Sequence, residues 1–173
     1  MIYIKVLFIS DIHGLDTNLH VIDEEIIDKK IDKLVVLGDL FSGSNRNNII
    51  NFLNKYKDII VCMKGNCDSF YDFNELEFPV YDDISCINVD DIKIYITHGN
   101  LYNVDKRNDF NGRILVYGHK HIPYIIEDNN QVFICVGSIS YPRDEKGCSY
   151  VIYENREFLI YDLDKNVIDG VKV

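Results

Sequence analysis

Apolar runs alternate with amphipathic segments over the first 63 residues, and this alternation constrains the fold more than any other feature. Three apolar runs rich in β-branched residues are typical of strands that are covered on both faces. They lie at 2–9, 33–37 and 59–63. Between them, apolar residues recur at helical spacing over 15–26 and about 46–57, and Asp16 or Thr17 is expected to cap the first helix. This β-α-β-α-β order predicts a parallel sheet with right-handed crossovers.

Short strands separated by turn residues dominate the second half of the chain. The expected strands are 84–89, 92–97, 114–117, 124–127 and 132–135, followed by a closing hairpin of 150–154 and 157–162. We therefore expect the first sheet to become mixed, or a second sheet to pack on it. Only three prolines are present and no repeat or composition shift divides the chain, so a single domain over residues 1–173 is predicted.

Charge and cysteine content narrow the choice of partner and compartment. The chain has 18 Lys and Arg against 28 Asp and Glu, a formal net charge of −10. This balance argues against polymeric nucleic acid and against an anionic membrane surface. No apolar run approaches the roughly 18 residues of a membrane span, and the N-terminus lacks the pattern of a signal peptide. Five cysteines without a CxxC spacing favour reduced thiols, and hence a cytoplasmic protein.

Polar residues gather where the expected strands end. The clusters are Asp11-Ile12-His13-Gly14, Gly38-Asp39, Gly65-Asn66-Cys67-Asp68, Thr97-His98-Gly99 and Gly118-His119-Lys120-His121. In open α/β sheets, ligands bind outside the carboxyl ends of the strands. Four of the five histidines, two carboxylates and one amide are therefore predicted to meet at one edge of the fold.

The chemistry of this set points to transition metals, because imidazole nitrogen and carboxylate oxygen suit Mn, Fe, Zn or Ni. In an extended segment, residues i and i+2 share a face, so Asp11 and His13 are expected to point the same way, as are His119 and His121. A carboxylate can bridge two ions, and Asp39 is the natural candidate. Two ions about 3.5–4 Å apart form the clamp that phosphatases and nucleases use.

These five blocks, in this order over residues 11–121, resemble the signature of the calcineurin-like metallophosphoesterase family. The Gly65-to-Ser69 form, the short chain and the 137–143 segment are similar to the small bacterial YfcE-type phosphodiesterases. The resemblance implies an α/β fold, a four-layer sandwich of two mixed β-sheets flanked by α-helices. It also implies a hydrolase acting on a small phosphate ester, and often a homo-oligomer.

The resemblance further implies which residues hold two divalent ions, with manganese the first expectation. One ion would be held by Asp11, His13, Asp39 and His121. The other would be held by Asp39, Asn66, His98 and His119. A hydroxide bridging the ions would then attack phosphorus in line with the leaving group.

One position departs from the family pattern, because Cys67 stands where most members have a histidine. We take Asn66, Cys67 and Asp68 as the catalytic candidates. The Cys67 thiol either donates a proton to the leaving group or is an ionised, weak ligand. Asp68 either orients a ligand or caps the next segment. Arg143 either meets a substrate phosphate or is a surface residue.

Two other functions stay open at this point. A scaffold of the same fold, like a retromer subunit, would bind protein partners with little or no catalysis. The complete set of seven ligand-type residues argues against it, because a scaffold has no chemical need for them. A nuclease is disfavoured by the net charge of −10.

Overall fold

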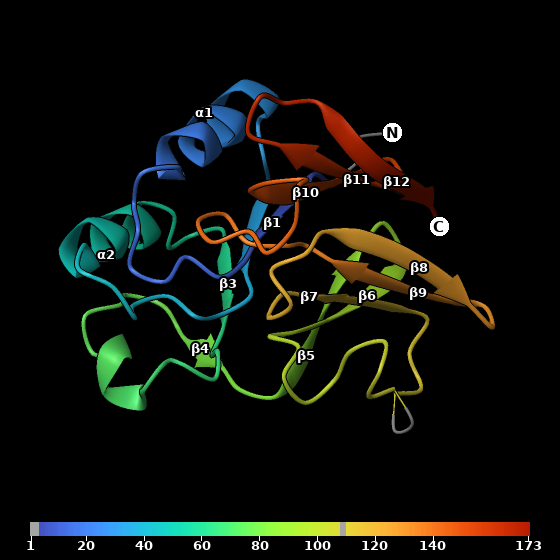
Figure 1. Ribbon diagram of the computed structural model, residues 1–173, viewed down its shortest axis with the longest axis horizontal. Helices are drawn as coiled ribbons and strands as arrows, with labels where there is room; N and C mark the ends of the chain where they lie inside the picture. The colour runs from blue at the N-terminus through green and yellow to red at the C-terminus, as the bar shows by residue number, and fades with distance from the viewer. Residues whose placement is uncertain (1–3, 108–109) are drawn as a thin grey trace.

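A computed structural model describes residues 4–107 and 110–173, and these residues form two β-sheets packed face to face (Figure 1). Helices α1 (Leu19–Lys29) and α2 (Arg46–Lys55) lie together on one side, and a short 3-10 turn, η1, spans Phe70–Phe73. None of the helices in the described residues is both long and apolar enough to cross a membrane.

The larger sheet has seven strands and contains the predicted parallel unit. In spatial order they are β12 (Val167–Lys172), β11 (Glu157–Asp162), β10 (Ser149–Glu154), β1 (Val6–Ile9), β2 (Lys33–Val36), β3 (Ile60–Met63) and β4 (Val80–Tyr81). Strands β1 to β4 are parallel, whereas β10 runs antiparallel to β1. The β-α-β-α-β order is confirmed, although residues 2 and 3 of the expected first strand lie outside the described residues. Strands β4 and β12 were not predicted.

The smaller sheet has five strands, and each matches a predicted strand to within one residue at either end. Its order is β5 (Ile84–Val89), β6 (Ile92–Thr97), β7 (Ile114–Tyr117), β9 (Gln131–Cys135) and β8 (Tyr124–Asp128). Strands β6, β7 and β9 are parallel, and the two edge strands are antiparallel to their neighbours. Both sheets are therefore mixed.

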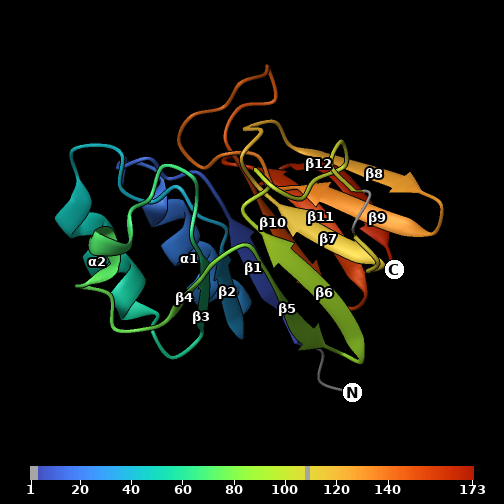
Figure 2. The same cartoon turned by 90° about the horizontal axis from the view of Figure 1, so that it is seen from below.

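The alternation of side chains along β1 shows how the layers are joined. Leu7 and Ile9 pack under α1 and α2, whereas Val6 and Phe8 face the five-stranded sheet. Both sets are fully buried, which explains why the run is continuously apolar. Figure 2 shows the second sheet lying over the first, with the helices to one side. The single domain expected over 1–173 stays a prediction.

The outer face of the five-stranded sheet, where the sandwich would have its fourth layer, is covered by a loop in the described residues. Leu115, Tyr117 and Phe133 of the five-stranded sheet are covered by Phe110, with Tyr102 packed alongside. The connection between β6 and β7 is too poor in apolar residues to form an amphipathic helix, so a few side chains cover the sheet instead. The predicted sandwich of two mixed sheets is confirmed, with its helices on one face.

The start of α1 differs from the prediction. The N-cap position is Asn18, and neither Asp16 nor Thr17 caps the helix. The Asp16 carboxylate instead accepts hydrogen bonds from the side chains of Asn45 and Asn48, at the start of α2. This carboxylate therefore ties the loop after β1 to the second helix.

Candidate metal centre

The predicted ligands lie in loops that follow β1, β2 and β3 of one sheet and β6 and β7 of the other. Five of them adopt left-handed backbone conformations, namely Asp11 (φ 55°), His13 (φ 49°), Asp39 (φ 55°), His119 (φ 65°) and His121 (φ 59°). The extended geometry expected for Asp11-x-His13 and for His119-x-His121 is therefore wrong. Tight left-handed turns bring these side chains together, and such conformations recur at functional sites.

Two glycines let the loops approach closely enough. A Cβ on Gly118 would lie 1.8 Å from Ser10 Oγ and 2.7 Å from Asp11 Oδ2. A Cβ on Gly65 would lie 2.1 Å from Asp39 Oδ1. Because a side chain at either position would displace a candidate ligand, the site requires glycine at both.

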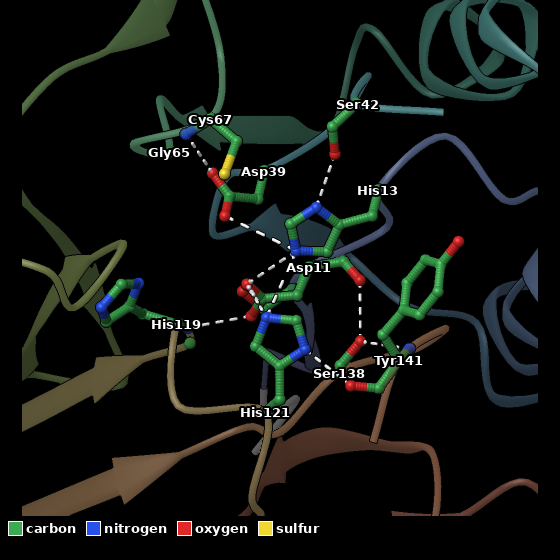
Figure 3. A network of polar contacts seen from close by, with 12 residues as sticks. Asp11, His13, Asp39, Ser42, Gly65, Cys67, His119, His121, Ser138 and Tyr141 are labelled. Carbon is green, nitrogen blue, oxygen red and sulfur yellow. Dashed lines mark hydrogen bonds and ion pairs between the residues drawn. The ribbon is translucent and has the colours of Figure 1, made fainter. Parts of the chain in front are cut away.

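Asp11, His13 and His121 form a first group of candidate ligands (Figure 3). Asp11 Oδ1 lies 3.2 Å from His121 Nε2 and 3.7 Å from His13 Nε2. The two Nε2 atoms are 3.2 Å apart, and the imidazole rings stack with centroids 5.0 Å apart. Asp11 Oδ2 accepts the main-chain N–H of His119 at 2.9 Å, which holds the carboxylate in place.

Asp39, His98 and Asn66 form a second group. His98 Nε2 lies 3.4 Å from Asp39 Oδ2 and 3.0 Å from Asn66 Oδ1. Asp39 and His98 are almost fully buried, at 2% and 1% exposed. Carboxylate, imidazole and amide oxygen thus converge on the side of the site nearest β3.

Asp39 lies between the two groups. Its Oδ2 is 3.6 Å from His13 Nε2 and 3.4 Å from His98 Nε2. Its Oδ1 accepts the main-chain N–H of Cys67 at 2.8 Å, and its carbonyl accepts the N–H of His13 at 2.8 Å. These bonds fix the carboxylate in the central position that a bridging ligand needs.

Several atoms with lone pairs face each other, as expected where a cation fits. His121 Nδ1 lies 2.6 Å from the Tyr141 carbonyl, and His98 Nδ1 lies 2.7 Å from the Leu37 carbonyl. Since a carbonyl only accepts, each Nδ1 carries the proton and each Nε2 of the neutral ring is left with a lone pair. His98 Nε2 then faces the Asn66 amide oxygen, and the buried Asp11 Oδ1 faces the Nε2 atoms of His121 and His13. Without ions, a second proton on the imidazole, at Nε2, can make the hydrogen bonds to these oxygen atoms. A bound divalent cation would replace that proton.

Electrostatics couple the carboxylates to the histidines. Burial raises the pKa of Asp11, but hydrogen bonds with His121 and His13 hold it well below its usual range. Burial likewise opposes ionisation of Asp39, and the contact with His98 nevertheless lowers its pKa. For His98, burial lowers the pKa, but the hydrogen bond with Asp39 gives a net rise. Both carboxylates are therefore ionised at neutral pH.

His119 is placed less tightly than the other candidate ligands. Its ring packs edge-on against the His98 ring, with centroids 5.1 Å apart and planes at 70°. Among the described residues, its ring nitrogens are not part of any group of three converging His, Cys, Asp or Glu ligand atoms. Its contribution to the second ion stays a prediction.

The Cys67 side chain points into the site. Its Sγ, one carboxylate oxygen of Asp39 and one ring nitrogen of His13 all lie within 4.8 Å of one another. Burial and the nearby Asp39 charge raise the pKa of the thiol to about 11. With no ion bound, the sulfur is therefore protonated at neutral pH. The Asn66 amide nitrogen lies 3.3 Å from this sulfur.

Asp68 is buried behind the loops, only 6% exposed. Its Oδ2 accepts the main-chain N–H groups of Asp39 (2.8 Å) and Gly65 (2.9 Å), and its Oδ1 accepts that of Leu40 (2.7 Å). Burial raises its pKa against these bonds. One carboxylate thus joins the loop carrying Asp39 to the loop carrying Asn66. This geometry favours the orienting role over the cap.

Three groups that contact the candidate ligands were not predicted from the sequence. The Ser42 hydroxyl lies 2.6 Å from His13 Nδ1, the Tyr141 carbonyl orients His121, and the Ser138 hydroxyl donates to the Asp11 carbonyl at 2.8 Å. The similarity of the 137–143 segment to the phosphodiesterases was the one signal for the last two. Ser42 lies in a polar turn that carries no recognisable pattern.

The fold and this cluster of ligands define a class of protein. The family model for the calcineurin-like phosphoesterase superfamily domain matches residues 4–157, so the chain belongs to this superfamily. The expected class, a hydrolase, is thereby confirmed. The family also implies divalent metal ions, for which the two groups of side chains are suitable ligands.

Particular relatives agree with this assignment. The chain is 28% identical to phosphodiesterase YfcE of Escherichia coli (strain K12), over 98% of each chain. It matches the solved structure of YfcE, described as a phosphoesterase from E. coli, with a TM-score of 0.90 and 27% identity over 98% of this chain and 99% of that one. The structure of Vacuolar Protein Sorting 29 from Cryptosporidium parvum matches over 100% of both chains, with a TM-score of 0.71 and 17% identity. That last likeness shows the fold alone.

Proposed function

We propose that this protein is a metal-dependent phosphodiesterase that hydrolyses small phosphate diesters at a two-metal site. The observation that carries the proposal is the central position of Asp39, whose Oδ2 lies within 3.6 Å of one histidine from each group of ligands. Two bound divalent ions would supply a hydroxide nucleophile at neutral pH and offset charge on the phosphoryl oxygens.

The residues of this chain have distinct parts in the proposal. Asp11, His13, Asp39 and His121 hold the first ion, and Asp39, Asn66, His98 and His119 hold the second. Asp68 positions Asp39 and Asn66 through the main chain. Water adds to phosphorus as one ester bond breaks, and the leaving oxygen takes up a proton. The Cys67 thiol, which points into the site, is the candidate donor of that proton.

The remaining parts of the proposal concern metal, partners and compartment. Manganese is the first choice of metal. These ligands also accept Fe, Zn and Ni, and availability decides among the four metals. A small substrate and not polymeric nucleic acid suits a chain of net charge −10. The five cysteines are free thiols, which supports a cytoplasmic location. A homo-oligomer is proposed from the family resemblance.

A metal-by-substrate screen tests the function. The protein is stripped with a chelator, reloaded with Mn, Zn, Ni or Fe, and assayed on p-nitrophenyl mono- and diesters and on cyclic nucleotides. We expect two bound ions per chain and hydrolysis of diesters. A chain that binds no transition metal and hydrolyses none of these esters would instead support the scaffold function.

Cys67 makes a separate prediction about leaving groups. Bound divalent ions would lower the pKa of the neighbouring thiol and favour its ionised form, which cannot protonate a poor leaving group. We expect diesters with a p-nitrophenyl leaving group to turn over faster than alkyl diesters and alkyl monoesters. Equal rates for p-nitrophenyl and alkyl leaving groups would contradict this reasoning.

A further inference from the structure

A pocket of about 430 Å³ opens beside the stacked rings of His13 and His121. It is lined by His13, Ser42, His121, Tyr141, Pro142 and Arg143. Its volume is within the range of small-molecule sites, about 300–1,000 Å³. The lining begins at the imidazole pair and does not include Asp39, so a group bound there lies beyond the space shared by the two ligand groups. Figure 3 shows Tyr141 on the far side of the two rings from Cys67.

Arg143 supplies the permanent positive charge of this pocket. Its main-chain N–H donates to the His121 carbonyl at 3.0 Å, which fixes its backbone relative to the candidate metal ligands. Its guanidinium is exposed and makes no hydrogen bond or ion pair with any residue of 4–107 or 110–173. In contrast, the side chains of Arg46 and Arg107 both pair with carboxylates. An arginine held at a pocket wall with its donors unused is suited to bind an anion.

We propose that Arg143 is a specificity-determining residue that binds a second anionic group of the substrate, a phosphate or carboxylate other than the diester being hydrolysed. This inference rests on the proposed phosphodiesterase function and names its substrate class. The physical reason is the charge of the protein. A chain of net charge −10 repels a doubly anionic substrate, and Arg143 offsets that repulsion where the second anion lies.

A matched pair of substrates tests this inference on the metal-loaded enzyme. Thymidine 5′-(p-nitrophenyl phosphate) and its 3′-phosphorylated derivative share a leaving group and differ by one phosphate. We expect kcat/KM to be about twofold to fivefold higher for the derivative, mainly through KM, since an exposed ion pair contributes less than a buried one. The preference should shrink as salt is added.

Three variants separate a binding role from a structural one. Arg143→Gln should abolish the preference, because it lowers kcat/KM for the phosphorylated derivative more than for the simpler diester, and Arg143→Lys should retain part of it. Arg113→Gln is the control, because Arg113 is also exposed and lines a different pocket. An unchanged preference in Arg143→Gln would overturn the inference, and so would an equal loss on both substrates, which would place Arg143 on the reacting phosphoryl group.

The result for the wild-type enzyme distinguishes the role of Arg143 from the proposed phosphodiesterase function. Hydrolysis of both diesters at equal kcat/KM would overturn the role of Arg143 and leave the phosphodiesterase function in place. Hydrolysis of neither substrate with two ions bound would overturn both.

Discussion

The Asp68→Asn substitution tests whether one buried carboxylate organises the metal centre. Oδ2 accepts two main-chain N–H groups and Oδ1 accepts a third. An asparagine of the same shape keeps one oxygen and turns an NH₂ group toward the remaining donor. One hydrogen bond to a charged acceptor is then lost and a buried N–H is left unpaired, which costs about 2–3 kcal/mol. For a chain of this length, that loss lowers Tm by about 5–10 °C.

Metal affinity gives a second readout. Because Asp68 holds the loops of Asp39 and Asn66 through main-chain N–H groups, its loss should weaken binding of the ions by about 10–100-fold. Calorimetry of the metal-free protein and titration against a chromophoric chelator measure the two effects. Asp82→Asn is the control, since Asp82 is exposed and, within residues 4–107 and 110–173, accepts a hydrogen bond only from its neighbour Asp83. A loss below about 0.5 kcal/mol, within the range of ordinary surface substitutions, together with unchanged metal affinity, would refute this reasoning.

Three further predictions concern the same site. Asp39→Asn should reduce the metal content from two ions to one or none and lower diesterase activity at least about 100-fold, because an amide bridges ions poorly; full activity would contradict the bridging role. The pKa of His98 is raised by its contact with Asp39 although burial opposes the shift. In chelator, the stability from this pair is fully present below the ordinary pKa of about 6.5 and is lost as pH rises through the raised value, so Tm should fall from pH 6 upward; a constant or rising Tm would contradict it. Gly118→Ala would place a methyl group 1.8 Å from Ser10 Oγ. We therefore expect calorimetry to show a loss of about 1–3 kcal/mol in the free energy of unfolding, and chelator titration to show weaker metal binding. Wild-type stability and metal affinity in this variant would contradict the clash.

The strands could be predicted because a strand that is buried on both faces is a continuous apolar run in the sequence. Val6 to Ile9 are each fully buried, and the sequence shows this as an unbroken apolar run. The edge strands β4, of two residues, and β12 lack such an apolar run, because most of their residues are exposed or half-buried. The cap of α1 was wrong for a related reason: Asp16 bonds to residues about 30 positions away, which competes with the local cap.

The sequence by itself predicted which candidate metal ligands lie near one another, although it missed Ser42, Ser138 and the Tyr141 carbonyl beside them. Parallel strands end at the same edge of a sheet, so residues such as Asp11 and Asp39, which follow β1 and β2, had to be neighbours. The residue types there then indicated transition metals. These conclusions needed only strand order and the chemistry of the ligands.

Only the tertiary structure decided how those side chains face one another. Left-handed turns aim Asp11 and His121 at each other across 110 positions of sequence, where extended segments were expected. The tertiary structure also sets Asp39 between two histidines, buries Asp68 behind the loops and leaves Arg143 at a pocket wall. Local sequence specifies none of this, because each orientation depends on contacts between loops that are far apart in the sequence.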